Sequence, residues 1–268
     1  MKEEEAYSIL DIISESDGQS VILTRSGSIC IPFELRQPEC YSLSPEDIDE
    51  RDGMYREAFR HMPDGAYVHK QDVFLKKEYH PGKGTGSFLD RADARHFEGR
   101  LYIDHTCILH FVLAGLKSLE KAYVSSPLAY KEHLHREDYR KLEAFLEGVD
   151  NAVSILQNMR GNSVLPMSCE GISGFTRAYS GLFGDTDAVV DIHVDGSLHV
   201  GKNHARCYAV CDETFLPEGN IESYVRDESL PPAASQLYHP LMEQLGMYLP
   251  YNHIVNQVIY FEGNERLR

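Results

Sequence analysis

Residues 102–113 read Tyr-Ile-Asp-His-Thr-Cys-Ile-Leu-His-Phe-Val-Leu, and this stretch decides how the chain is organised. It leads into the longest apolar run of the sequence, around 108–114, which His110 interrupts. A run of this length is typical of a buried strand, because a membrane span needs about 18 or more apolar residues. We therefore predict a buried strand here, and the segments around it define the fold.

The segment that follows this strand predicts the longest helix of the chain. From Tyr139 to Met159, apolar residues recur every three or four positions, and Gly161 is placed to end the helix. A short helix is expected over 88–97, just before the strand, and another strand over 66–75.

Toward the N-terminus the pattern predicts one more helix and a hairpin. Ser44-Pro45-Glu46-Asp47 is a helix start, with proline in the first turn and acidic residues against the helix dipole, and Pro63-Asp64-Gly65 ends this helix. Val21-Ile22-Leu23 and Ile29-Cys30-Ile31, joined by a Ser-Gly-Ser turn, predict an opening hairpin.

The resulting order is strand, helix, strand, strand, helix, with the short helix between the two middle strands. This is most of a split β-α-β, or ferredoxin-like, unit, and the chain is predicted to be α+β with mixed or antiparallel sheets. Residues 1–165 would form a first α+β subdomain, and 166–268 a second segment of hairpins and helices packed on it. The elements expected in that second segment are a helix near 170–182, strands near 188–194, 197–201 and 204–211, a helix near 235–247 and a strand near 253–262.

The amino-acid composition and the net charge exclude several classes of function. The chain has 268 residues, 42% of them apolar, and a net charge of −16, so it is a globular protein that does not bind nucleic acid directly or adhere to an anionic bilayer through charge. The N-terminus, Met-Lys-Glu-Glu-Glu, is no secretory signal, and no transmembrane segment is predicted. We expect a cytoplasmic protein whose six cysteines are reduced.

Gly196 to Asn203 comes close to a phosphate-binding P-loop. The motif requires Ser or Thr at its last position to hold Mg²⁺, where this chain has Asn203, and a helix must follow. The flanking residues alternate as strands do, so we interpret the segment as a β-hairpin with an Asp195-Gly196 turn and expect no nucleotide cofactor.

Three further patterns contain residues typical of reactive or ligand-binding sites, but none of them completes a motif. Gly171-Ile172-Ser173-Gly174 is one residue short of a nucleophile elbow, and a helix start explains it more simply. Metal-binding side chains occur at His193, His199, His204, Cys207 and Cys211, but strand alternation would require these ligands to converge from opposite faces of a sheet, so no metal site is predicted. A glycine-rich loop at 80–86 has its lysine in the wrong order for a phosphate site.

His69, Lys70, Gln71 and Asp72 are the candidate interaction residues. Four consecutive polar side chains on a predicted strand must find partners or solvent. The alternatives are a solvated edge strand or a structural hydrogen-bond cluster.

Several segments, taken in order, resemble one known family. They are Val68-His69-Lys70-Gln71-Asp72, Ser87-Phe88-Leu89, Arg95-His96-Phe97-Glu98-Gly99-Arg100, His105-Thr106-Cys107 and Leu249-Pro250-Tyr251-Asn252-His253-Ile254-Val255-Asn256-Gln257. This series resembles the N-terminal region of the TraG-type conjugation ATPases of Bacteroidetes conjugative transposons, which are relatives of type IV secretion motors. The resemblance extends over nearly the whole chain.

The resemblance implies a non-catalytic N-terminal assembly or docking domain for DNA transfer. In such proteins ATP hydrolysis belongs to a C-terminal RecA-like domain, and residues 262–268 are expected to lie where the connection to that domain begins. The implied partners are protein components of the conjugation apparatus at the inner membrane, or neighbouring subunits in a homo-oligomer. The alternative from a different class is a small hydrolytic enzyme with a site near Ser173.

Overall fold

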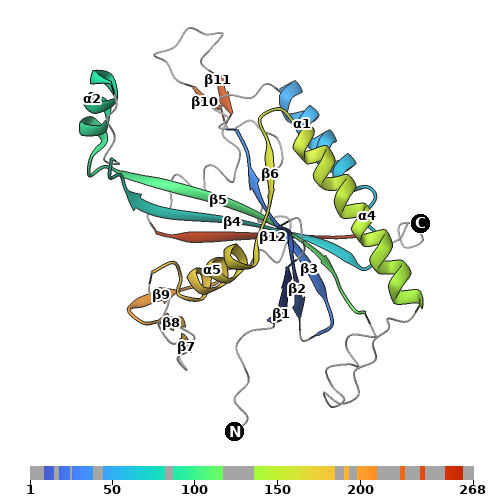
Figure 1. The fold of residues 1–268 in the computed structure, drawn as a ribbon. Coiled ribbons are helices and arrows are strands. Elements are labelled where there is room, and N and C mark those ends of the chain that lie inside the picture. The colour runs from blue at the N-terminus through green and yellow to red at the C-terminus, as the bar shows by residue number, and fades with distance from the viewer. Residues whose placement is uncertain are drawn as a thin grey trace.

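The computed structural model describes residues 9–14, 18–24, 26–38, 45–81, 87–116, 136–184, 190–192, 198–209, 224–226, 236–238 and 251–261. It has the predicted α+β fold (Figure 1). Its elements are β1 (Ile9–Ser14), β2 (Ser20–Thr24), β3 (Ile29–Arg36), α1 (Pro45–Phe59), β4 (Ala66–Glu78), α2 (Phe88–Phe97), β5 (Leu101–Leu113), α4 (Arg136–Asn158), β6 (Ser163–Pro166), α5 (Cys169–Ser180), β7 (Val190–Ile192), β8 (Leu198–Val200), β9 (Asn203–Ala205), β10 (Tyr224–Arg226), β11 (Gln236–Tyr238) and β12 (His253–Tyr260).

The predicted ferredoxin-like unit is present. It runs β3-α1-β4-β5-α4-β6, with α2 inserted between β4 and β5. Its strands lie side by side in the order β6-β3-β5-β4, and each of these neighbours is antiparallel. Strand β5 therefore lies between β3 and β4, which is the split β-α-β arrangement.

Three more strands extend this sheet. β1 and β2 add a hairpin beside β3, and β12 pairs with β4 over eight residues. β12 comes from the second predicted segment, and the predicted boundary between 165 and 166 falls inside β6. Strands from both segments thus share one sheet.

One face of the sheet carries the main core. Helices α1 and α4 lie side by side over this face (Figure 1) and bury alternate residues of β3 and β5 beneath them. Phe111 of β5 is fully buried and meets Phe33 and Phe59 edge to face, at centroid distances of 5.8 and 6.3 Å. Gly161 ends the α4 region with a φ of +80°, as predicted, and a Cβ there would lie 2.9 Å from Pro38.

A smaller core lies on the opposite face. Cys30 of β3 and Val112 of β5 pack there with Ile22 of β2 and with Ile172 of helix α5. The alternation of each strand therefore directs one set of side chains toward α1 and α4, and the other toward α5.

The interpretation of the P-loop-like segment as a hairpin is confirmed. β7, β8 and β9 form a three-stranded antiparallel sheet, and Gly201 and Lys202 lie in the turn between β8 and β9. The predicted turn at 195 and 196 is outside the described residues. The helix expected near 235–247 is wrong at 236–238, which form β11 and pair with β10, because a cross-strand partner overrides a weak helical pattern. Residues 239–247 lie outside the described part of the chain.

The ends of β4 and β5 project from the body of the sheet and carry α2 at their tip (Figure 1). We call residues 75–81 and 87–104 the arm. α2 forms because Ser87 and Asp90 make a reciprocal capping box, in which Oγ of Ser87 accepts from the backbone of Asp90 at 3.3 Å. No residue of α2 is buried. The predicted loop at 80–86 is described only at residues 80 and 81.

Candidate functional site

The four candidate interaction residues lie on β4 and point to opposite faces of the sheet. Lys70 and Asp72 lie on the α1 and α4 face, whereas His69 and Gln71 lie on the α5 face, because successive side chains of a strand alternate. Gln71 and Asp72 are buried, at 5% and 1% exposure. The structure thus divides the four residues between two separate clusters.

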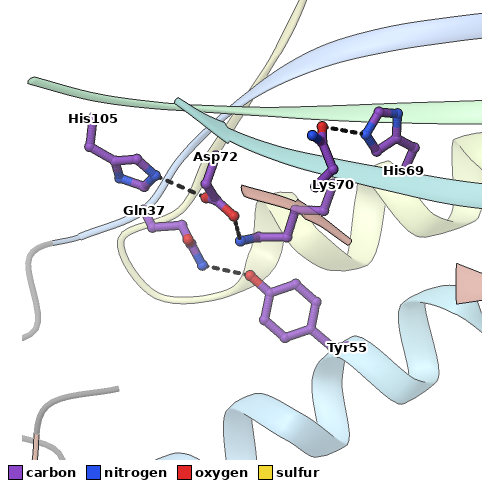
Figure 2. A network of polar contacts seen from close by, with 7 residues as sticks. Gln37, Tyr55, His69, Lys70, Asp72 and His105 are labelled. Carbon is purple, nitrogen blue, oxygen red and sulfur yellow. Dashed lines mark hydrogen bonds and ion pairs between the residues drawn. The ribbon is translucent and has the colours of Figure 1, made fainter. Parts of the chain in front are cut away.

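The first cluster, the Asp72 cluster, consists of Lys70, Asp72 and His105. Figure 2 shows the Asp72 carboxylate between the other two side chains: Nζ of Lys70 donates to one oxygen, and Nε2 of His105 donates to the other at 2.9 Å. Burial by itself would raise the pKa of Asp72, but the hydrogen bond from His105 and the charge of Lys70 outweigh burial and lower it. Asp72 is therefore a buried carboxylate that stays charged.

Aromatic stacking extends this cluster along the same face. The ring of Phe74 stacks between His105 of β5, at 4.5 Å, and His253 of β12, at 4.7 Å. Opposite Asp72 lies Cys107, whose pKa burial raises to about 12. This cysteine is a neutral thiol at physiological pH, and such a group is not a nucleophile.

The second cluster lies on the α5 face around Asn256 of β12. Its side-chain oxygen Oδ1 lies 2.9 Å from Nε2 of His69 and accepts from Nε2 of Gln71 at 2.9 Å. The His69 ring also stacks on His110, its direct neighbour on β5, at 5.2 Å. These contacts join three adjacent strands.

The buried Cys30 and the half-buried His110 form a pair next to this cluster. Sγ of Cys30 lies 3.8 Å from Nδ1 of His110. Burial raises the pKa of Cys30 to about 12, while burial and the adjacent His69 lower the pKa of His110 to about 4. Both groups are neutral near pH 7, so the pair is not the thiolate and imidazolium of a catalytic cysteine. Nε2 of His110 has no hydrogen-bond partner among the described residues.

The low pKa of His110 predicts a pH-dependent stability. In the unfolded chain a histidine titrates near 6.5, so between about 6.5 and 4 the unfolded state binds a proton that the folded state excludes. We expect the free energy of unfolding to fall as pH drops through this window, by as much as roughly 3 kcal/mol. Urea denaturation at several pH values measures this loss.

The matched variants for this prediction are His110→Phe and His96→Phe. The first should flatten the pH dependence between 4 and 6.5, because phenylalanine keeps the ring stacking without titrating. The second alters an exposed histidine of α2 and should leave the dependence as it is. Equal slopes in the wild type and His110→Phe would contradict the assignment.

The other patterns singled out in the sequence do not converge in the structure. Ser173 is exposed within α5, and the serine that caps this helix is Ser168, whose Oγ accepts from the backbone of Gly171 at 3.2 Å. Within the described part of the chain, Ser173 has no hydrogen bond to a histidine. The described residues include no group of three or more side chains suited to a metal ion. Of the five metal-binding side chains, only His199 and His204 are seen to lie together in the described ranges, opposite one another on β8 and β9 with ring centroids 4.0 Å apart. Cys207 is exposed, whereas His193 and Cys211 lie outside the described residues.

The arm is the feature that sequence reasoning missed. Its exposed apolar side chains are Phe88 at 77%, Leu89 at 71%, Leu101 at 63%, Phe97 at 47%, Tyr102 at 42%, Tyr79 at 38% and Ile103 at 37%. Scattered apolar side chains are normal on a surface, but a concentration of them at the tip of a projecting hairpin is typical of a contact site. The sequence signal that could have indicated this contact site is the short helix α2, because its apolar residues have no core within reach.

No protein-family model matches this chain, and no curated protein matches it significantly. None of the helices in the described ranges is both long and apolar enough to cross a membrane. Function must therefore be argued from the arm, from the polar clusters and from the resemblance of the sequence motifs.

Proposed function

We propose that this chain is a non-catalytic assembly or docking domain of a TraG-type conjugative-transfer ATPase. It would attach the motor to protein components of the type IV secretion apparatus at the inner membrane. The order of the sequence motifs supports the family, and the arm supports a role in protein contacts. The observation that carries the proposal is the outward face of α2.

The two sides of α2 differ in what they contact. Phe97 packs edge to face on Tyr79 of the hairpin at 6.4 Å, and Ala94 is half-buried. At 100° per residue, Phe88 lies half a turn from Phe97, whereas Leu89 lies 140° from Ala94 but only 80° from Phe97, on the flank of the helix. Phe88 and Leu89 are nevertheless the two most exposed apolar side chains of α2, and we refer to them as its outward face.

Such a helix suits insertion into an apolar groove of another protein. Aromatic and aliphatic anchors on one helix face are the usual determinants of this binding mode. Arg95 lies only 20° from Phe88 around the helix and Arg91 lies 60° from it, so their charged ends would have to remain solvated beside the apolar anchor. The neutral state of Cys30 and His110 near pH 7 supports a structural role for that cluster rather than a catalytic one.

The double variant Phe88→Ser/Leu89→Ser tests the proposal. We expect it to weaken capture of co-expressed inner-membrane components of a conjugation apparatus by on the order of ten-fold or more, because apolar anchors dominate such contacts. Its thermal stability should be nearly unchanged, since both side chains are exposed. Co-purification with the tagged chain measures the capture.

The matched control is Tyr139→Ser/Leu146→Ser, which removes two exposed apolar side chains from α4 instead. Capture should be kept in this control. Equal loss in both variants would remove the arm from the contact. Magnesium-dependent ATP turnover by the purified chain that Lys202→Ala abolishes would contradict the non-catalytic assignment.

A further inference from the structure

The two outer edges of the arm differ in polarity: the edge of β4 is charged, and the edge of β5 is apolar. Beyond Phe74, where the pairing with β12 ends, the edge of β4 carries Lys76, Lys77 and Glu78. Charged residues of this kind normally protect an edge strand from pairing. The edge of β5 carries the exposed residues Leu101, Tyr102 and Ile103 instead. Only the β5 edge is therefore chemically suited to take another strand.

The β5 edge is open where the arm leaves the body. β3 pairs with β5 only as far as Cys107, and no other described strand lies beside residues 101–106 on that side. The backbone nitrogen of Tyr79 donates to the oxygen of Arg100 at 2.9 Å, so the carbonyl of Arg100 points toward β4. By alternation, Leu101, Ile103 and His105 direct their N–H and C=O groups outward, available to a new strand.

The sequence of this edge is complementary to itself. In an antiparallel pair with two-fold symmetry about Tyr102, Leu101 of one copy lies opposite Ile103 of the other, and Tyr102 lies opposite Tyr102. Arg100 then lies opposite Asp104, so each end of the contact pairs opposite charges. In this register, the residues whose backbone N–H and C=O groups point outward lie opposite one another, as an antiparallel ladder requires.

The neighbouring registers fit less well. A pair centred on Leu101 places Glu98 opposite Asp104, which opposes two negative charges. A pair centred on Ile103 places Arg100 opposite Thr106 and leaves no ion pair across the contact. The register about Tyr102 alone combines apolar pairing with opposite charges, and like charges directly opposite are unfavourable.

We propose that the partner of the β5 edge is a second copy of this chain. The two arms pair antiparallel about Tyr102 and form a two-fold dimer in which the sheets of both copies are continuous. This inference rests on the proposed function as a domain for protein contacts and names the partner of one surface. The outward face of α2, which carries Phe88 and Leu89, stays available to a different partner.

Two charge reversals test the register. Arg100→Glu places a second carboxylate opposite Asp104, and Asp104→Arg places a second guanidinium opposite Arg100, so each variant should dimerise about ten-fold more weakly than the wild type. An equimolar mixture of the two variants should recover the dimer, because a charge pair of opposite sign is restored across the contact. Sedimentation equilibrium of the full chain measures the wild type, both variants and their mixture.

Recovery in the mixture separates the contact from any folding defect, including the loss of the ion pair that Asp104 makes with Lys77 in its own copy. A wild-type chain that stays monomeric, or a mixture that associates no better than its components, would overturn the proposal. A monomeric wild type whose Arg100→Glu variant loses capture of secretion components would assign the edge to a strand of those components, which also overturns the second-copy assignment.

The two proposals fail in different ways. If Phe88→Ser/Leu89→Ser loses capture while the wild type does not dimerise, the proposed docking function is supported and the proposed dimer is contradicted. If the wild type dimerises in the predicted register while capture is independent of Phe88 and Leu89, the proposed dimer is supported and the proposed docking surface is contradicted.

Discussion

Asp72→Ala is expected to lower the free energy of unfolding at neutral pH by about 3 kcal/mol, the lower end of the range for breaking a buried ion pair. The side chain of Asp72 is only 2% exposed and accepts from both Lys70 and His105. Removing the carboxylate leaves the ammonium of Lys70, whose side chain is 21% exposed, without its partner, and this partly desolvated charge causes most of the loss.

The pH dependence of Asp72→Ala separates charge from packing. Because the folded pKa of Asp72 is lowered, its contribution is complete above the unfolded value near 3.9 and is lost as pH falls through the folded pKa. Stabilities of the wild type and the variant should therefore converge below pH ~4. Asp52→Ala is the control, because its partner Arg56 is exposed and such pairs contribute less than about 1 kcal/mol. A constant difference at all pH values would show that packing, not charge, is responsible.

Phe111→Ala is expected to cost about 3 to 5 kcal/mol of unfolding free energy. The side chain is fully buried on β5, one of the two central strands of the ferredoxin-like unit, and it contacts Phe33 of β3 and Phe59 of α1. A cavity at this point removes aromatic contacts from both layers that meet there. Chemical denaturation followed by circular dichroism measures the loss.

The control for Phe111→Ala is Phe88→Ala, which removes the same atoms from a side chain that is 77% exposed. That change should lie within roughly 0.5 kcal/mol of the wild type. Similar losses in the two variants would contradict the assignment of the main core to the α1 and α4 face.

Local sequence patterns were sufficient to predict the elements that are defined by residues close together in the sequence. The recurrence of apolar residues from Tyr139 to Met159 was enough for α4, and the apolar run around 108–114 was enough for β5. β1 and β6 were missed for different reasons. β6 has only four residues and pairs with β3, which is distant in sequence, so no local pattern contains its partner. β1 pairs with the neighbouring β2, but a register shift between Ile9 and Asp11 interrupts its alternation.

The same limit applies to the polar clusters. Alternation alone separates Lys70 and Asp72 from His69 and Gln71, so their division between two faces could have been predicted. The contacts with His105 and Asn256 could not, because they depend on the registers of β5 and β12 against β4. A shift of one residue in either register would move each partner to the opposite face.

The position of β12 has a consequence for the order in which a ribosome-bound chain can complete its sheet. β4 is synthesised early, but the strand that covers its outer edge is His253–Tyr260, separated from β4 by most of the chain. Until that strand emerges, the side chains of His69 and Gln71 lack the Asn256 oxygen that they share in the finished protein. During translation the nascent chain therefore presents an unfinished sheet edge, which is a state open to chaperones and to premature association.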